Sequence, residues 1–179
     1  AAMRLLDAGS VKRLPGDRFS ACMLDANLSS EALEAAAAHF DIPLVADPVS
    51  CEKAQRLRSI LPRLTALKPN LREALELTGT DSLSDAASAL LDKGVKQVYI
   101  SLGKDGLYCA TGDQRLQLPS IPAPMGPATG AGDAMTAGLV CAIAGHQSLE
   151  ECAQSGLRFA HEHLSRMAAI NSVPESNII

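Results

Sequence analysis

Residues 64–79, LTALKPNLREALELTG, carry the pattern that decides the fold. The apolar run 64–67 has the length of a strand, and a helix predicted over 70–77 follows it and ends at Gly79, a residue suited to positive φ. Helical patterns separate this strand from further apolar runs of strand length at 19–24, 43–46 and 97–101. Strands that alternate with helices are typical of a mostly parallel sheet covered by helices, with right-handed crossovers.

The remaining segments complete an α/β pattern. A helix is predicted over 31–40, with Ser29 or Ser30 as its cap, and others over 52–61 and 83–91. Residues 106–110 and 115–118 form a strand pair, and a proline-rich connector over 119–127 leads to two helices at 134–143 and 148–169. We therefore expect residues 1–179 to form a single α/β domain, a mostly parallel sheet with helices on both faces.

The composition excludes several classes of function. The chain has 179 residues, a net charge of −4 and only 3% aromatic residues, with no Trp. This composition argues against a basic surface for nucleic acids or anionic membranes and against aromatic platforms that bind single strands. Its five cysteines include no CxxC pair, which is typical of reduced thiols rather than of disulfides or zinc sites. We expect a cytoplasmic protein that binds neither nucleic acid nor a membrane.

The turn at residues 129–133, Thr-Gly-Ala-Gly-Asp, is the strongest candidate for chemistry. Closely spaced glycines at the start of a helix let backbone N–H groups converge on an anion such as a phosphoryl group. Asp133 beside such an anion hole can accept the proton of an attacking hydroxyl. The alternative is a glycine turn before a tightly packed helix, with Asp133 as a favourable first-turn charge. The chain has no P-loop motif, and Met135 stands where a dinucleotide fingerprint needs Gly or Ala.

These residues resemble the ribokinase (PfkB) family of carbohydrate and nucleoside kinases. Residues 129–134, TGAGDA, are similar to the family's C-terminal signature, and three further matches occur in the family's order: 68–73 (KPNLRE), 101–106 (SLGKDG) and Phe159-Ala160 near the adenine. The resemblance implies a ribokinase-like fold and phosphoryl transfer from ATP to a sugar or nucleoside. By the same resemblance Asp133 is the base, and the anion-hole amides are those of Gly130, Ala131 and Gly132.

The resemblance also implies a nucleotide and metal site. Asn70 and Glu73 would organise Mg²⁺ through water, although the same pair makes a good capping box. The ATP site would be lined by Ser101, Gly103, Gly106 and His161, although the two glycines also suit a turn and His161 also suits a packed position. Pro127 stands where many members carry an aspartate tied to a monovalent cation, so potassium activation is uncertain for this chain.

Two segments bear on the substrate and on completeness. Residues 47–53 and 67–70 are similar to the corresponding segments of pseudouridine kinases, which phosphorylate the ribose 5′-hydroxyl. The alternatives are ribokinase, fructokinase or ribonucleoside kinase activity. A further alternative is a nucleotide-binding remnant without catalysis. The chain opens like the middle of a helix, and nothing in it is similar to the family's sugar-binding part or lid. We expect the catalytic C-terminal portion of a longer chain, and a homodimer of the full-length protein is left open.

Overall fold

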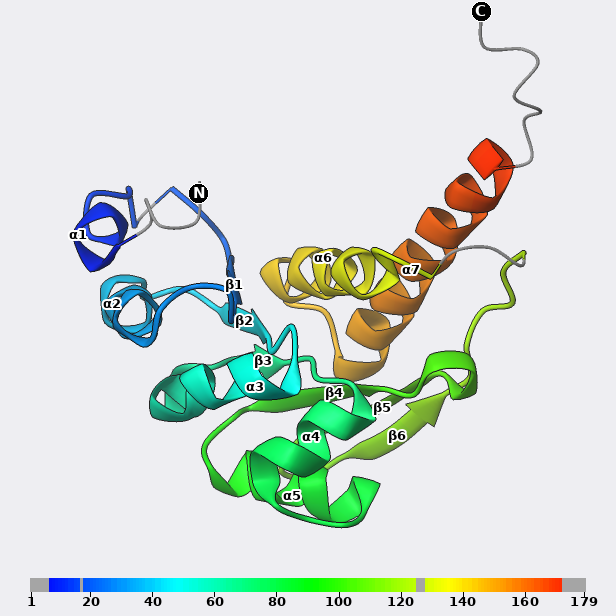
Figure 1. The fold of residues 1–179 in the computed structure, drawn as a ribbon, viewed down its shortest axis with the longest axis horizontal. Helices are drawn as coiled ribbons and strands as arrows, with labels where there is room; N and C mark the ends of the chain where they lie inside the picture. Colours follow the sequence, from blue (N-terminus) through cyan, green and yellow to red (C-terminus); the bar gives the residue numbers. More distant parts are fainter. Residues whose placement is uncertain (1–6, 17, 125–127, 172–179) are drawn as a thin grey trace, which may run out of the picture.

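A six-stranded sheet forms the centre of the molecule (Figure 1). The computed structural model describes residues 7–16, 18–124 and 128–171, and Pro127 lies outside them. The strands lie in sequence order: β1 (Cys22–Asp25), β2 (Leu44–Asp47), β3 (Ala66–Leu67), β4 (Gln97–Ser101), β5 (Leu107–Ala110) and β6 (Arg115–Leu118). Neighbouring strands from β1 to β4 pair in parallel, whereas β5 pairs antiparallel with both β4 and β6. The mostly parallel α/β sheet that the sequence predicts is confirmed.

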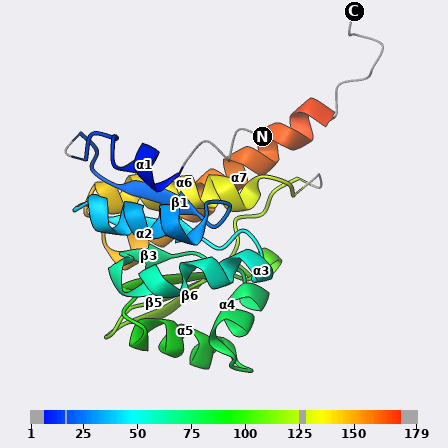
Figure 2. The same cartoon turned by 60° about the vertical axis from the view of Figure 1, so that its left-hand side comes forward.

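The order of the strands decides where the helices lie. Parallel strands added in one direction by right-handed crossovers place every connecting helix on the same face of the sheet. Figures 1 and 2 show this layer. It contains α1 (Ala8–Val11), α2 (Ser30–His39), α3 (Cys51–Ala54), the 3₁₀ helix η2 (Gln55–Arg63), α4 (Leu71–Thr78) and α5 (Leu83–Asp92).

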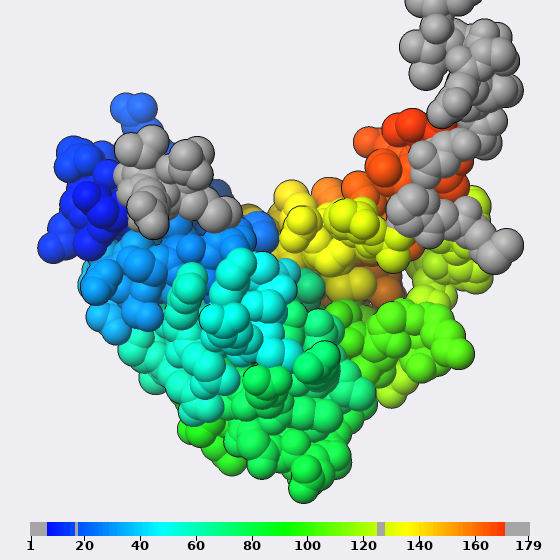
Figure 3. All heavy atoms as spheres, viewed as in Figure 1, coloured from blue at the N-terminus to red at the C-terminus, as the bar shows by residue number. Residues whose placement is uncertain are grey.

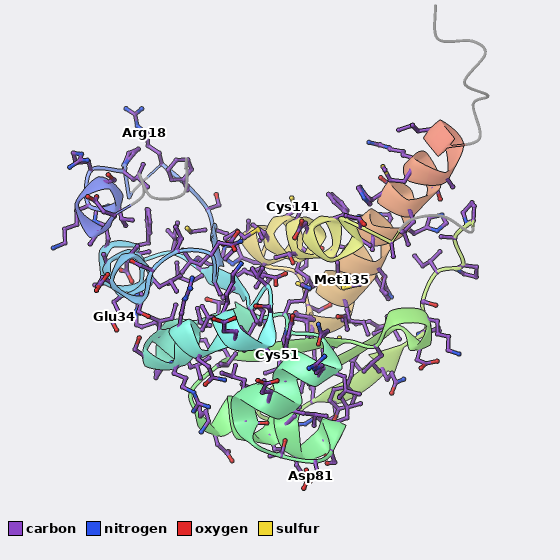
Figure 4. All side chains as sticks on the ribbon, viewed as in Figure 1. Arg18, Glu34, Cys51, Asp81, Met135 and Cys141 are labelled. Atoms are coloured by element: carbon purple, nitrogen blue, oxygen red, sulfur yellow. The ribbon has the colours of Figure 1, made fainter. Side chains whose placement is uncertain are left out.

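The opposite face is covered by α6 (Ala131–Ala144) and α7 (Leu149–Asn171), which pack against each other. Alternate strand residues such as Val45, Tyr99 and Leu107 form a second apolar core with these two helices. Figure 4 shows Met135 on the side of α6 toward the sheet and Cys141 on its outer side, in agreement with their burial. Helices on both faces of the sheet are therefore confirmed.

Local signals set most helix ends. Ser29 caps α2 by accepting from the amide of Ala32, and Asn70 and Glu73 form a complete capping box at α4. Gly79 ends α4 with a φ of +73°. All five cysteines are free. None of the helices in the described part of the chain is both long and apolar enough to span a membrane.

The structure corrects two predicted helices. The helix expected over 52–61 is α-helical only over Cys51–Ala54 and continues as 3₁₀ helix through Pro62, whose ring conflicts with an α-helical carbonyl four residues earlier. The helix expected to begin at Ala134 begins at Ala131. This places Asp133 inside the first turn of α6, because Gly130 takes the N-cap position with a φ of +86°.

Two glycines in the turn between β4 and β5 differ in their surroundings. Gly103 begins the 3₁₀ helix η3 (Gly103–Asp105) with a φ of +60°, and a Cβ there would meet no atom within 4 Å. Gly106 follows with a φ of +95°, and a Cβ there would collide with the carbonyl oxygen of Leu118 in β6. The positive φ favours glycine at both positions. At position 106 the close approach of the β6 backbone is a second reason for glycine, and this reason is absent at position 103.

We predict that Gly106→Ala destabilises the chain more than Gly103→Ala. The left-handed backbone alone costs about 1–2 kcal/mol at either position, and the collision with β6 adds about 1–3 kcal/mol at position 106. Urea unfolding of the two variants measures the difference. Equal losses would contradict the close approach of Gly106 to β6.

Candidate active site

The candidate site lies at the carboxyl edge of the parallel strands. Asp47 ends β2, Lys68 follows β3 and Ser101 ends β4, so three polar residues from distant segments meet along one edge. Helix α6 lies beside them, since Thr136 in its second turn bonds to Asp47, and Gly132 and Asp133 of its first turn line the same cavity as Asp47. This is the edge where open α/β sheets generally bind ligands.

A buried ion pair joins this edge to α6. Lys68 Nζ lies 3.1 Å from Asp47 Oδ2, and both side chains are less than a tenth exposed. Thr136 donates its hydroxyl to the same carboxylate oxygen at 2.9 Å and also lies 3.0 Å from the Gly132 carbonyl. The hydrogen bond from Thr136 to the paired carboxylate therefore joins α6 to the ends of β2 and β3.

The capping box of α4 lies beside this ion pair. The Asn70 amide donates to Glu73 Oε2 at 2.9 Å, and the Glu73 amide donates to Asn70 Oδ1 at the same distance. The pKa of the Glu73 carboxyl is raised, chiefly because the group is buried. The hydrogen bond from the Asn70 amide lowers this pKa, and the nearby charge of Asp47 raises it. The structural interpretation of this pair is confirmed, while its predicted role in binding magnesium stays a prediction.

The start of α6 presents backbone donors and one carboxylate. Gly130 offers no side-chain cap, and the first N–H groups of a helix have no carbonyl acceptor within it. The Ala131 amide donates to the Ala128 carbonyl at 3.2 Å, so it is engaged within its own turn. Asp133 is exposed in the first turn. The amides near Gly130 and Gly132 together with Asp133 make a place for an anion next to a proton acceptor.

Two adjoining cavities open at this edge. We call them the polar cavity, of about 450 Å³, and the apolar cavity, of about 550 Å³; Ser101 and Gly132 line both. The apolar cavity lies between η3, the connector at 120–124 and helices α6 and α7, a region seen in the space-filling view of Figure 3. Both volumes are in the range of small-molecule sites.

The structure brings all of the predicted site residues to these two cavities. Those that line the polar cavity are Asn70, Glu73, Ser101, Gly130, Gly132 and Asp133. Those that line the apolar cavity are Ser101, Gly103, Gly106, Ala131, Gly132 and His161. Their roles in binding and catalysis stay predictions, but their spatial convergence is a fact of the fold.

The sequence analysis missed several residues of the polar cavity. Asp25, the last residue of β1, and Asn27, in the turn that follows it, line this cavity together with Val49. Asp25 accepts from the Asn27 amide at 2.7 Å, and Lys53 Nζ donates to Asn27 Oδ1 at 2.5 Å, so the turn is held in place. The sequence does carry a signal for these residues, because polar residues at the carboxyl end of a buried parallel strand lie at the edge of the sheet where ligands bind.

Comparison with known proteins decides the family. Residues 18–176 match the model of the pfkB family of carbohydrate kinases. The chain belongs to this family. A cytidine kinase of Thermococcus kodakarensis is 38% identical to this PfkB chain over 112 residues, which are 62% of the chain and 40% of the relative. A pseudouridine kinase of Escherichia coli is 34% identical over 133 residues, which are 68% of the chain and 41% of the relative.

A solved structure agrees with the fold of this PfkB chain. The ribokinase of Arabidopsis thaliana, complexed with ribose and ATP, superposes with a TM-score of 0.71 at 26% identity, covering 93% of the chain and 55% of that protein. The ribokinase-like α/β fold predicted from the sequence is therefore confirmed. The chain spans about two fifths of the curated relatives that it matches, at 40% and 41%.

We predict that Lys68→Met destabilises the chain by about 3–5 kcal/mol, because it leaves the buried Asp47 carboxylate without its cation. The double variant Asp47→Asn with Lys68→Met should recover part of this loss. Lys96→Met, at an exposed position, is the matched control and should change the free energy of unfolding by no more than about 0.5 kcal/mol. A Lys68→Met variant as stable as the control would show that the ion pair is not needed.

Proposed function

We propose that this chain is the nucleotide-binding and catalytic part of an ATP-dependent kinase that phosphorylates a hydroxyl of a sugar or nucleoside. One observation carries the proposal: Asp133 and the amides at the start of α6 face the polar cavity, which shares Gly132 and Ser101 with the apolar cavity. A phosphoryl group at the shared glycine would then lie between a nucleotide on one side and an acceptor on the other.

The apolar cavity suits the base of a nucleotide. Its walls include Met135, Leu157 and Leu164, which offer apolar contact to a flat ring. His161 lines the same cavity, and its Nδ1 is buried without a hydrogen-bond partner among the described residues. A buried polar atom without a partner is costly, so a ligand that bonds to His161 would remove that cost.

The polar cavity suits a magnesium ion that keeps most of its own waters. Asn70 and Glu73 offer the hard oxygen atoms that Mg²⁺ prefers, and the described residues hold no group of three or more His, Cys, Asp or Glu side chains that would enclose a metal. Held by this pair through water, the ion would neutralise charge on the phosphates. The capping box fixes both side chains for that task, since each already accepts a backbone N–H.

The reaction follows from the positions of these groups. The acceptor hydroxyl oxygen attacks the γ-phosphorus of ATP, its proton passes to the Asp133 carboxylate, and the bond from phosphorus to the ADP oxygen breaks. Amides near Gly130 and Gly132, with the positive end of α6, stabilise charge on the transferred phosphoryl group. Lys68 stays paired with Asp47 and holds the turn, so it takes no part in proton transfer.

The proposed acceptor is pseudouridine, phosphorylated at its ribose 5′-hydroxyl. The similarity of residues 47–53 and 67–70 to pseudouridine kinases supports this choice, as does the relative from Escherichia coli. Asp25 and Asn27 supply polar groups in the polar cavity for a hydroxyl-rich ligand. Cytidine is the alternative, because the relative from Thermococcus kodakarensis, named a cytidine kinase, has the higher identity of the two.

We predict that the full-length protein releases ADP faster with pseudouridine than with cytidine, uridine, ribose or fructose. A preference of the unsubstituted protein for a free hexose would overturn the assignment of pseudouridine as the acceptor.

In the same assay Asp133→Asn should lower kcat by about 10²–10⁴-fold, because an amide cannot take the proton. Calorimetry should show an unchanged affinity for nucleotide in this variant. An Asp133→Asn variant with full kcat would show that Asp133 is only a favourable charge at the helix terminus.

We predict that Glu73→Gln separates the two roles of that residue. Glutamine keeps an acceptor for the Asn70 amide, so the capping box and the free energy of unfolding should change by less than about 1 kcal/mol. The increase in ATP affinity on adding Mg²⁺ should be lost, because the charge is gone. Glu76→Gln, on the same helix at an exposed position, is the control. If Mg²⁺ still increases the ATP affinity of Glu73→Gln, Asn70 and Glu73 have only their role as a capping box.

A further inference from the structure

His163 on α7 contacts the turn that begins α6. Its Nε2 lies 2.8 Å from the carbonyl oxygen of Thr129, a residue 34 positions earlier in the chain. The same ring covers Gly130, because a Cβ at that glycine would lie 2.7 Å from Nε2 and 3.0 Å from Cε1. The imidazole therefore packs on the left-handed glycine and bonds to the carbonyl that precedes it.

This contact constrains the direction of a backbone donor. The Thr129 carbonyl and the Gly130 N–H belong to one peptide unit, and in a planar trans peptide the two groups point in opposite directions. Holding the carbonyl toward α7 therefore aims the Gly130 N–H away from α7. Gly130 lines the polar cavity, whereas His163 lines neither cavity.

We propose that His163 is a positioning residue for the proposed kinase reaction, which orients the Gly130 amide toward the phosphoryl group by holding the Thr129 carbonyl. The contact between His163 and Thr129 is a feature of the fold, whereas its effect on phosphoryl transfer rests on the proposed function. A glycine with a φ of +86° has a freely variable backbone, so without an outside contact this peptide unit could rotate. At the other side of the turn lies the Thr136 hydroxyl, whose single proton is shared between Asp47 Oδ2 and the Gly132 carbonyl.

Two variants separate the hydrogen bond from the packing. His163→Phe keeps a ring over Gly130 and removes the donor, while His163→Gln replaces the ring by a flexible chain that carries an N–H donor at a similar reach. Glu162→Gln, at an exposed neighbouring position on α7, is the matched control. If His163→Phe fails to fold, His163→Leu removes the donor with a smaller side chain.

The first readout is independent of catalysis. In spectra of the chain labelled with ¹⁵N-glycine, the Gly130 amide signal should move in His163→Phe and return toward its original position in His163→Gln. The Glu162→Gln control should leave it in place. A Gly130 signal that does not move in His163→Phe would overturn the proposal, whether or not the protein binds nucleotide.

The second readout compares two ligands. Loss of one hydrogen bond corresponds to about a fivefold change in affinity, so His163→Phe should bind the ATP analogue AMP-PNP about fivefold more weakly, and adenosine should bind as before. His163→Gln should restore most of the loss. Equal weakening for both ligands would make His163 a packing residue and overturn the proposal. If the unsubstituted chain binds neither ligand, the proposed function fails, and the amide signal alone decides the role of His163.

Discussion

The buried ion pair between Lys68 and Asp47 is the interaction on which the site depends. Helix α6 packs on the face of the sheet opposite to the crossover helices, and the hydroxyl of Thr136 ties it to the same carboxylate oxygen that pairs with Lys68. Two charges that are almost fully buried must stay paired, because an unpaired buried charge costs several kcal/mol. The paired carboxylate, which also accepts from Thr136, therefore couples α6 to the ends of β2 and β3.

The order of the strands explains why the site opens where it does. Since β1 to β4 follow one another in one direction, their carboxyl ends form one continuous edge, and the helices that connect them cover a single face. The start of α6 and the β4–β5 turn complete that edge from the other side. Residues between positions 23 and 164 thus meet around two adjoining cavities.

Backbone groups carry much of the proposed chemistry. Amides at the start of α6 need no side chain, but they need the left-handed conformation of Gly130 and a neighbour that fixes the direction of each peptide unit. His163 contacts one side of the turn and Thr136 the other. The asparagine and glutamate at the start of α4 are likewise held by a capping box, and both residues line the polar cavity.

The sequence by itself determined the alternation of strands and helices and the cap at Asn70, because these depend on local periodicity and on short motifs. It left the cap of α2 open between Ser29 and Ser30, and it named the candidate site residues through motifs shared with a family. It misjudged the helix that ends near Pro62 and the first residue of α6. Only the tertiary structure decided the pairing of Lys68 with Asp47 and the contact of His163 with Thr129. Such contacts join residues far apart in the chain, and a hydrogen bond across that separation leaves no periodic pattern in the sequence.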